Sequence, residues 1–300
     1  IIVASFFSVY PITFGSSVVI SSFFENIPNN NKILFQISKK NIKKSNIKNI
    51  VNQSDSKIIK LFSVFLLIKK ILSEIKHSNY RNVLIIEGAS WIGYSFILLV
   101  LVKIWFKKVM IIYRGHSIEY EIRKRNSNFI ISKLSFIFEK FVYKNSDIST
   151  SVSLFEKKKI KKLYKVKTSL FPNIVEFSKS NKNYSKPFKQ YIIYSGSYDY
   201  LPNKKAIDRL VNKIMPIIIK KKPNLKLILT GSKEIPYSYD WLKNLGMLSK
   251  DRYLNVLKNS ICLIVPTREG YGTRVKIIEA LCKGVIVVSS KIGIEGISYD

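Results

Sequence analysis

Short apolar runs alternate with longer amphipathic stretches along most of this chain. Runs such as Val83–Ile86, Val109–Tyr113 and Ile261–Val265 are continuously apolar, as in strands that are buried on both faces. Stretches such as Lys57–Lys76 and Leu154–Tyr164 repeat their apolar residues with the period of a helix. This alternation predicts an α/β fold with parallel sheets.

The same pattern predicts the remaining elements. The expected strands are Ile1–Val9, Lys32–Ile37, Asp147–Thr150, Thr168–Phe171, Tyr191–Tyr194, Leu225–Leu229, Leu242–Gly246 and Val285–Ser289. The expected helices are Val18–Asn26, Trp91–Phe106, Ser127–Tyr143, Lys204–Lys220, Asp251–Lys258 and Arg274–Lys283. We expect an exposed loop over Asn41–Ser56, which is polar and rich in lysine. Ile1–Val9 lacks a basic leader and a cleavage site, which favours a buried strand over a signal peptide.

Trp91–Phe106 is the most apolar helix candidate. It contains Lys103 and is shorter than the roughly 20 residues that span a bilayer. We therefore expect a core helix or a helix on a membrane surface, with a transmembrane helix as the less favoured alternative.

A polar stretch without apolar periodicity divides the chain. Residues Ser178–Pro187 have this character and end at a proline. The sequence thus predicts an N-terminal domain over 1–177, a linker over 178–189 and a C-terminal domain over 190–300, each Rossmann-like.

The net charge of +32 indicates attraction to polyanions such as nucleic acid, anionic lipid or phosphorylated substrates. Compositional drift is an equally open explanation, because lysine, isoleucine, asparagine and serine are abundant throughout. The basic residues are scattered and form no recognition module, so we expect no specific nucleic acid partner.

Cysteines and histidines are few. Cys262 and Cys282 lie in apolar surroundings and form neither a disulfide framework nor a metal cluster, which favours a reducing, cytoplasmic compartment. With only His77 and His116, a histidine metal site is not expected.

The most informative stretch follows the strand Ile261–Val265. Its loop contains Gly270 and Gly272, which permit close approach of a ligand to the backbone. A helix then begins at Arg274 and is stopped by Gly284. Val275, Ile278 and Leu281 are expected to form its buried stripe.

A glycine loop that opens a helix is a place where anions bind. Arg274 and Lys276 add positive charge there, whereas Glu279, one turn further, suits hydroxyl groups better than phosphate. Phosphate and hydroxyl recognition together indicate a nucleotide sugar. The alternative is an ordinary strand–loop–helix unit with a solvated, charged face.

The stretch resembles the donor signature of family-4 glycosyltransferases of GT-B fold, in the subgroup with the motif P-x-R-x-G-x-G-T-R-x-K-x-x-E-A. The positions that match are Pro266, Arg268, Gly270, Gly272, Thr273, Arg274, Lys276, Glu279 and Ala280, and then Gly284, Val287, Val288, Ser289, Ser290, Gly293, Glu295 and Gly296. Many members carry a second glutamate where this chain has Tyr271, so the group that contacts the sugar ring is left open.

Weaker resemblances lie elsewhere. His116, Glu119 and Tyr120 are similar to the family's His-Asn-x-Glu-Tyr element, and Pro172–Val175 to the segment that closes its first domain. Gly196, Ser197, Pro202 and Asn203 match G-S-x-x-x-x-P-N, with Ser197 in place of a common arginine. Gly15 lies in a loop that the family places near the donor phosphates, and Gly246 where it places contacts to the base.

This resemblance implies a retaining, metal-independent hexosyltransferase with two domains facing a cleft and no cofactor. Arg274, Lys276 and the amides of Gly272 and Thr273 would hold the diphosphate, Glu279 the ribose, and His116 the sugar. The acceptor would be a glycan or a lipid-linked glycan of cell-surface polysaccharide synthesis, with the enzyme at the inner, anionic membrane surface. The family usually continues beyond the elements present here, so a truncated C-terminal domain is expected.

Three alternatives stay open at this stage. A sugar-nucleotide epimerase or hydrolase could have the same fold. A basic protein that binds polyanions without catalysis would explain the charge. A truncated donor domain could bind its nucleotide and lack activity.

Overall fold

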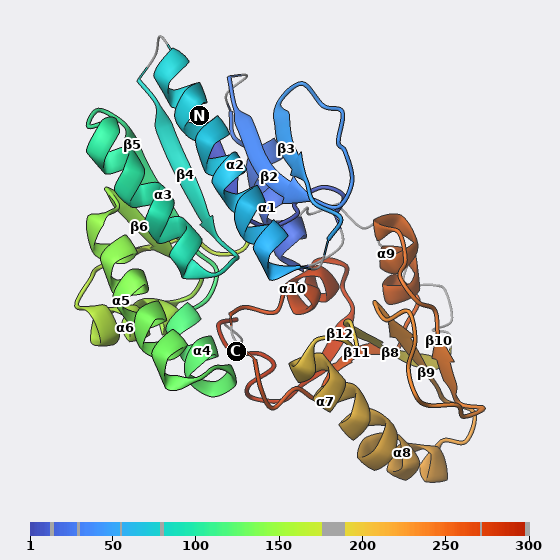
Figure 1. The fold of residues 1–300 in the computed structure, drawn as a ribbon. Coiled ribbons are helices and arrows are strands. Elements are labelled where there is room, and N and C mark those ends of the chain that lie inside the picture. Colours follow the sequence, from blue (N-terminus) through green and yellow to red (C-terminus); the bar gives the residue numbers. More distant parts are fainter. Residues whose placement is uncertain are drawn as a thin grey trace. The chain divides into compact units, whose positions relative to one another are not determined.

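The computed structural model describes residues 1–12, 15–28, 31–54, 56–78, 81–175, 190–270 and 272–297. The chain divides into two compact units, one consisting mainly of Ile1–Ile174 and the other of Val175–Gly270 with Arg274–Ile297. Each unit is a parallel sheet with helices packed on it (Figure 1). The parallel α/β prediction is therefore confirmed. The predicted linker 178–189 lies outside the described residues, so the domain boundaries stay a prediction.

The first unit has a seven-stranded sheet in the order β3-β2-β1-β4-β5-β6-β7, with every neighbouring pair parallel. Its elements are β1 (Ile2–Ser5), α1 (Gly15–Glu25), β2 (Ile33–Ser38), β3 (Ile47–Val51), α2 (Lys57–His77), β4 (Val83–Gly88), α3 (Ile92–Trp105), β5 (Met110–Gly115), α4 (Glu119–Asn126), α5 (Phe129–Asn145), β6 (Ile148–Ser151), α6 (Leu154–Tyr164) and β7 (Ser169–Leu170).

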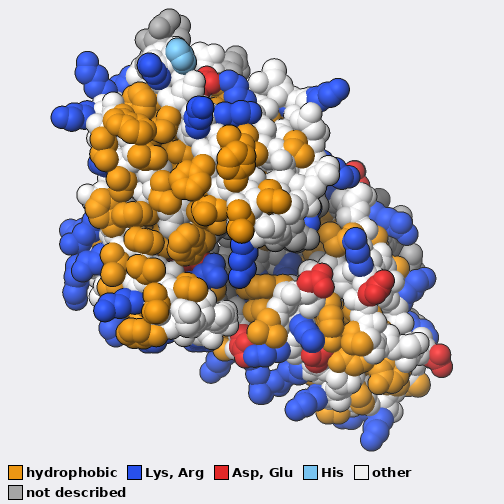
Figure 2. Space-filling view, viewed as in Figure 1, with side chains coloured by type: hydrophobic (Ala, Val, Ile, Leu, Met, Phe, Trp, Pro, Cys, Tyr) orange, Lys and Arg blue, Asp and Glu red, His pale blue; other side chains and the backbone are white. Residues whose placement is uncertain are grey.

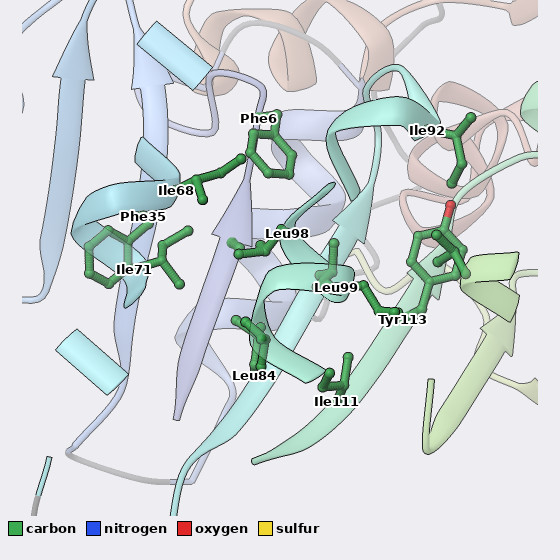
Figure 3. Close-up of a cluster of buried hydrophobic side chains, with 14 of the residues drawn as sticks. Phe6, Phe35, Ile68, Ile71, Leu84, Ile92, Leu98, Leu99, Ile111 and Tyr113 are labelled. Atoms are coloured by element: carbon green, nitrogen blue, oxygen red, sulfur yellow. The ribbon is translucent and has the colours of Figure 1, made fainter. Parts of the chain in front are cut away.

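Apolar side chains pack on both faces of this sheet. Helices α2, α3, α5 and α6 contribute to the larger cluster, and α1 contributes to the other. Figure 3 shows part of the larger cluster, where side chains of α2 and α3 lie over the strands: Ile68, Ile71, Leu98 and Leu99 near Phe35, Leu84 and Ile111. One side of the apolar helix α3 thus packs in the core, as the first of its interpretations predicted. No helix in the described part of the chain is both long and apolar enough to cross a membrane.

The expectation of a loop over Asn41–Ser56 is wrong, because this segment contains β3. The strand pairs with β2 at the edge of the sheet and buries Ile47 and Ile50. Lys48 points outward and pairs with Glu74 of α2, with 2.6 Å between the charged atoms. Two buried isoleucines are enough for an edge strand. The lysines around them made the segment look like an exposed loop in the sequence.

Helix α4 was not predicted, since its sequence is strongly polar and has no local side-chain cap. Its cap comes from another helix. Glu139 of α5 accepts hydrogen bonds from the backbone N–H groups of Glu119 and Tyr120, both at 2.8 Å. These are two of the N–H groups that a helix start leaves without an internal partner. A carboxylate 20 residues away along the chain therefore fixes where α4 begins.

The second unit has a five-stranded parallel sheet in the order β10-β9-β8-β11-β12. Its elements are β8 (Tyr191–Ser195), α7 (Leu201–Arg209), a π-helical turn (Leu210–Ile214), α8 (Met215–Lys221), β9 (Lys226–Thr230), β10 (Leu242–Asn244), α9 (Lys250–Lys258), β11 (Cys262–Val265), α10 (Val275–Cys282) and β12 (Ile286–Ser289). The predicted helix Lys204–Lys220 thus starts earlier and is interrupted just before Pro216, which cannot donate a helical hydrogen bond.

We expect Glu139→Leu to destabilise the first unit strongly. Besides the two N–H groups, the carboxylate accepts the hydroxyl hydrogen of Tyr164 at 2.6 Å, and it is fully buried. Leaving a buried polar group unsatisfied costs about 1–3 kcal/mol. Urea unfolding should therefore show a loss of at least about 3 kcal/mol for Glu139→Leu. Glu139→Gln keeps one acceptor oxygen and should lose less, and equal losses in both variants would contradict this account.

Candidate functional site

The second sheet has a topological switch point at β8. From this strand the sheet continues through β9 on one side and through β11 on the other. Loops that leave two such strands diverge and form a crevice at their carboxyl ends, where α/β proteins bind ligands. Gly196 and Ser197 follow β8, and residues 266–273 follow β11. Two segments that the sequence singled out therefore end at the same edge.

Three glycines meet at this edge. The N–H of Gly196 donates to the carbonyl of Thr230, and the N–H of Gly231 donates to that of Gly246, each at 2.8 Å. Gly231 has φ +89°, and a Cβ there would lie 3.1 Å from the backbone of Gly196. Gly246 also has a positive φ, +67°. The sequence analysis selected Gly196 and Gly246 but missed Gly231, although the pair Thr230-Gly231 at a strand end is its signal.

The loop after β11 winds closely past Arg274. Gly270 has φ +121°, and a Cβ there would lie 2.8 Å from Nη2 of Arg274. The same Nη2 donates to the carbonyl of Ile292 at 3.5 Å. Gly272 has φ +71°, whereas Tyr271 lies outside the described residues. Glycine at position 270 therefore leaves room for the guanidinium, and the positive φ at both positions favours glycine.

Lys276 lies in the first turn of α10 and points toward the end of β8. Its Nζ donates to the carbonyl of Ser195 and lies 4.4 Å from the centre of the Tyr194 ring. Burial, and then the neighbouring charge of Arg274, lower the pKa of Lys276 to about 7. An anion bound beside this amine would favour its protonated form and raise that pKa.

The start of α10 concentrates positive charge. Arg274 is its N-cap residue, Lys276 follows in the first turn, and that turn contains no acidic residue. The free N–H groups of a helix start already carry positive partial charge, so cations there disfavour the helix. A bound anion would offset this cost. Thr273 directly precedes Arg274, so an anion at the start of α10 would also approach the N–H group of Thr273.

Glu279 lies one turn beyond Lys276 and is half-buried. Burial raises the pKa of its carboxyl to about 7, and the positive charges of Lys250 and Lys283 oppose that rise. Glu279 in turn contributes to a raised pKa of the Tyr253 hydroxyl, after the effect of burial. The Glu279 carboxyl is therefore partly removed from water, and a hydroxyl group could donate to it.

One detail of the predicted helix, its buried stripe, is wrong. The residues of α10 that are buried are Ile277 and Ala280, whereas Leu281 is half exposed, so the buried stripe is turned from the predicted one. Gly284 ends the helix with φ +69°, as expected. The following strand β12 is at the sheet edge and exposes Ile286 and Val288, so it is not buried on both faces.

The loop after β8 is held by its own hydrogen bonds. The Ser197 hydroxyl donates to Asp199 at 3.2 Å. Ser232, which the sequence analysis missed, donates to the carbonyl of Gly196 and accepts from the N–H of Tyr198, both at 2.9 Å. Ser197 therefore lies in the turn after β8, and Ser232, after β9, holds both of its neighbours.

Asn203 lies inside helix α7 and does not cap it. Helix α7 begins at Leu201 after Tyr200, and the side chain of Asn203 accepts from the Tyr194 hydroxyl at 2.9 Å. A Cβ on Gly196 would lie 2.7 Å from that side chain. Asn203 thus explains why a glycine follows β8.

In the first unit, His116 directly follows β5 and contacts a buried ion pair. Its Nε2 lies 2.6 Å from Oε2 of Glu87, whose Oε1 accepts from Arg114 at 2.5 Å. The Arg114 guanidinium lies over the ring of Phe23, 3.7 Å from its centre. Burial alone would raise the pKa of Glu87, but Arg114 and His116 outweigh it and lower that pKa below its ordinary value. Glu87 therefore orients His116, and the sequence analysis missed this role.

Gly15 is the first residue of α1, so its predicted place in a loop is wrong, because the helix begins three residues before Val18. After β1, the side chain of Gln36 accepts from the N–H groups of Val9 and Tyr10 at 2.9 and 2.8 Å. Gln36 is fully buried at the end of β2. Nothing in the local sequence signals this interaction between β2 and the loop that follows β1.

Within the described residues, no three His, Cys, Asp or Glu side chains lie close enough to hold a metal ion. Cys262 and Cys282 are free thiols, and Cys262 is buried.

Comparison with known proteins bears on this second unit. Residues 189–299 match the family model described as Glycosyl transferases group 1. A curated relative, described as an uncharacterized 44.6 kDa protein in cps region of Klebsiella pneumoniae, is 23% identical over 218 residues. That alignment covers 63% of this chain and 53% of the relative, so the chain spans about half the length of the curated relative it matches.

Solved structures show the same fold over nearly the whole chain. Sucrose-phosphate synthase from Thermosynechococcus elongatus has a TM-score of 0.73 at 14% identity, covering 97% of this chain and 81% of that one. WaaG, titled as a glycosyltransferase involved in lipopolysaccharide biosynthesis, has a TM-score of 0.67 at 10% identity with the same coverage. The likeness shows the GT-B fold, with one Rossmann-like unit in each half of the chain.

We expect the contribution of Glu279 to stability to fall as the pH rises. The folded protein binds the Glu279 proton more tightly than the unfolded chain, because the pKa is raised from 4.5 to about 7. This contribution is present below pH 4.5 and is lost as the pH rises through about 7. The unfolding free energy of wild type, measured relative to that of Glu279→Gln, should fall by on the order of 2 kcal/mol between pH 5 and 8. Glu234→Gln, at an exposed position of the same unit, is the control.

Glu87→Gln should cost about 3–5 kcal/mol of unfolding free energy, because it leaves the buried charge of Arg114 without its partner. Glu74→Gln breaks an ion pair that is partly exposed and should cost less than about 1 kcal/mol. Chemical denaturation measures the unfolding free energies of both variants. Similar losses would refute the claim that burial makes the Glu87 ion pair more costly to break. The ring ¹⁵N chemical shifts of His116 should change in Glu87→Gln alone.

Proposed function

We propose that this chain is a retaining glycosyltransferase that uses a nucleotide sugar as its donor. The observation that carries the proposal is the cationic start of α10, where Arg274 and Lys276 lie at the positive end of a helix beside glycine loops. Two cations at this end disfavour the helix when no ligand is bound, and an anionic ligand would offset that cost. The group 1 glycosyltransferase match over the same residues supports a nucleoside diphosphate as that anion.

In this proposal each residue has a distinct role. Arg274, Lys276 and the amides of Gly272 and Thr273 hold the diphosphate and stabilise the charge that develops on it. Glu279 accepts hydrogen bonds from the ribose hydroxyls, and its raised pKa falls when a donor hydroxyl binds.

The other predicted site residues have positioning roles. The backbone at Gly196, Ser197, Gly246 and Gly270 leaves room for the donor, and Gly15 begins the helix near its phosphates. His116, oriented by Glu87, contacts the transferred sugar.

The chemical step needs no metal in this scheme. The acceptor oxygen attacks the anomeric carbon on the face from which the diphosphate departs. The bond from that carbon to the phosphate oxygen breaks, the new glycosidic bond forms, and the hydroxyl proton passes to the departing phosphate. Positioning and charge stabilisation therefore supply most of the acceleration.

We further propose an acceptor that is a glycan or a lipid-linked glycan in cell-surface polysaccharide synthesis. The chain would act in the cytoplasm, at the anionic inner face of the membrane. The similarity in fold to WaaG, a glycosyltransferase involved in lipopolysaccharide biosynthesis, supports this class of acceptor. The excess of lysine supports the anionic membrane surface.

The proposal is tested by thermal shift with UDP, GDP, ADP and their sugars. A ligand at 100 times its dissociation constant stabilises by about 2.7 kcal/mol. One nucleotide series should raise the melting temperature of wild type, and Arg274→Ala and Lys276→Met should each weaken its binding at least tenfold. Arg252→Ala, which removes an exposed arginine of the same unit, is the matched control.

Glu279→Ala separates the two parts of the donor. It should weaken nucleotides and nucleosides alike, whereas the Arg274 and Lys276 variants should affect only the phosphorylated ligands. Binding of every nucleotide with equal, salt-sensitive affinity, unchanged in these variants, would favour the polyanion-binding alternative. Product analysis without acceptor distinguishes transfer from epimerisation or hydrolysis.

A further inference from the structure

Helices α2 and α5 of the first unit each expose a stripe of large apolar side chains. On α2 the stripe contains Ile58, Phe62 and Phe65, and on α5 it contains Ile130, Leu134 and Ile137. Ile58 is 80% exposed, Phe62 62% and Ile130 67%. The spacing of three or four residues places each stripe on one side of its helix, opposite the residues that pack on the sheet. We call these two stripes, with the outer side of α3, the apolar face.

The apolar face is continuous from α5 to α3. Phe96 of α3 stacks on Phe138 of α5 with 4.4 Å between ring centres, and it meets Phe141 edge-on at 5.1 Å. Trp105, at the end of α3, is 60% exposed. Figure 2 shows a broad apolar area on the first unit, where Figure 1 places these helices. Exposed patches of this kind mark surfaces that bind a partner.

Apart from two carboxylates, the charged side chains of α2 and α5 are positive. Lys69 of α2 and Lys133 and Lys140 of α5 are interspersed with the apolar residues. The two carboxylates of α2 and α5 are both engaged: Glu74 pairs with Lys48, and Glu139 is buried under α4. The apolar face is therefore also a cationic face.

We propose that the apolar face lies on an anionic lipid bilayer. Apolar side chains can enter the region between headgroups and acyl chains, while lysines at its border meet anionic headgroups. A second copy of the chain would instead bring lysine against lysine, and a nucleic acid would offer nothing to the exposed phenylalanines and isoleucines. A bilayer is the one partner that matches both the apolar surface and the charge.

The topology gives this contact an orientation. Helices α2 and α5 run antiparallel to the strands they cover, so their N-terminal ends lie at the carboxyl edge of the sheet. Ile58, Phe62 and Ile130 belong to those ends, and His116 follows β5 at the same edge. A lipid-linked acceptor would thus reach His116 from the bilayer. This last step rests on the proposed function, whereas the membrane contact itself does not.

Vesicle sedimentation of the whole chain tests the proposal. Wild type should bind vesicles of phosphatidylcholine mixed with phosphatidylglycerol. Its affinity should be at least tenfold lower for vesicles of phosphatidylcholine alone, and at least tenfold lower in high salt. The double variant Phe62→Ser with Ile130→Ser should lose at least tenfold in vesicle affinity without a change in melting temperature. The matched control replaces Val51 and Ile217, which are 45% and 64% exposed outside the apolar face, by serine.

Trp105 supplies a second readout. Its fluorescence should shift to the blue when anionic vesicles are added. The Trp105→Phe variant should lose most of that shift but should still sediment with the vesicles. Failure of wild type to bind anionic vesicles, or equal losses in the two double variants, would overturn the proposal. So would a dimer in solution that the Phe62/Ile130 variant abolishes.

The membrane contact and the donor site can fail separately. The Phe62/Ile130 variant should keep the nucleotide-dependent thermal shift of wild type, because its substitutions lie in the first unit. Loss of vesicle binding with the shift retained supports the apolar face and leaves the donor site intact. Vesicle binding without any nucleotide shift would count against the proposed function alone.

Discussion

The repulsion at the start of α10 is the interaction on which the second unit depends. Two cations, Arg274 and Lys276, share the positive end of one helix. The surrounding structure reduces this repulsion by directing them apart: Arg274 toward the carbonyl of Ile292 and Lys276 toward that of Ser195. Gly270 must lack a side chain for Arg274 to lie there.

The first unit depends on buried carboxylates in a similar way. Glu87 holds Arg114 and His116 together at the ends of β4 and β5, and Glu139 holds the start of α4. Burying a carboxylate is costly unless every oxygen has a partner. In both cases the partners come from separate elements, so each carboxylate fixes the mutual position of segments that carry site residues.

The two proposed ligands, a diphosphate and anionic lipid, would each meet part of the large positive charge. Part of it surrounds the crevice of the second unit, where it suits a diphosphate. Another part borders the apolar face of α2, α3 and α5, where it suits anionic lipid. Compositional drift toward lysine accounts for charge spread over a surface, but it does not place lysines around exposed phenylalanines.

The sequence by itself determined the alternating parallel fold, most element positions and the glycine–arginine–lysine segment, because these follow from local patterns of polarity and from backbone freedom at glycine. It did not reveal β3, α4, the buried side of α10, or the parts played by Gln36, Glu87 and Gly231. Each of these depends on a partner distant along the chain: a neighbouring strand, a capping carboxylate, or a loop that only the folded sheet brings near. Tertiary structure decided them because a hydrogen bond or an ion pair leaves no periodic trace in the sequence.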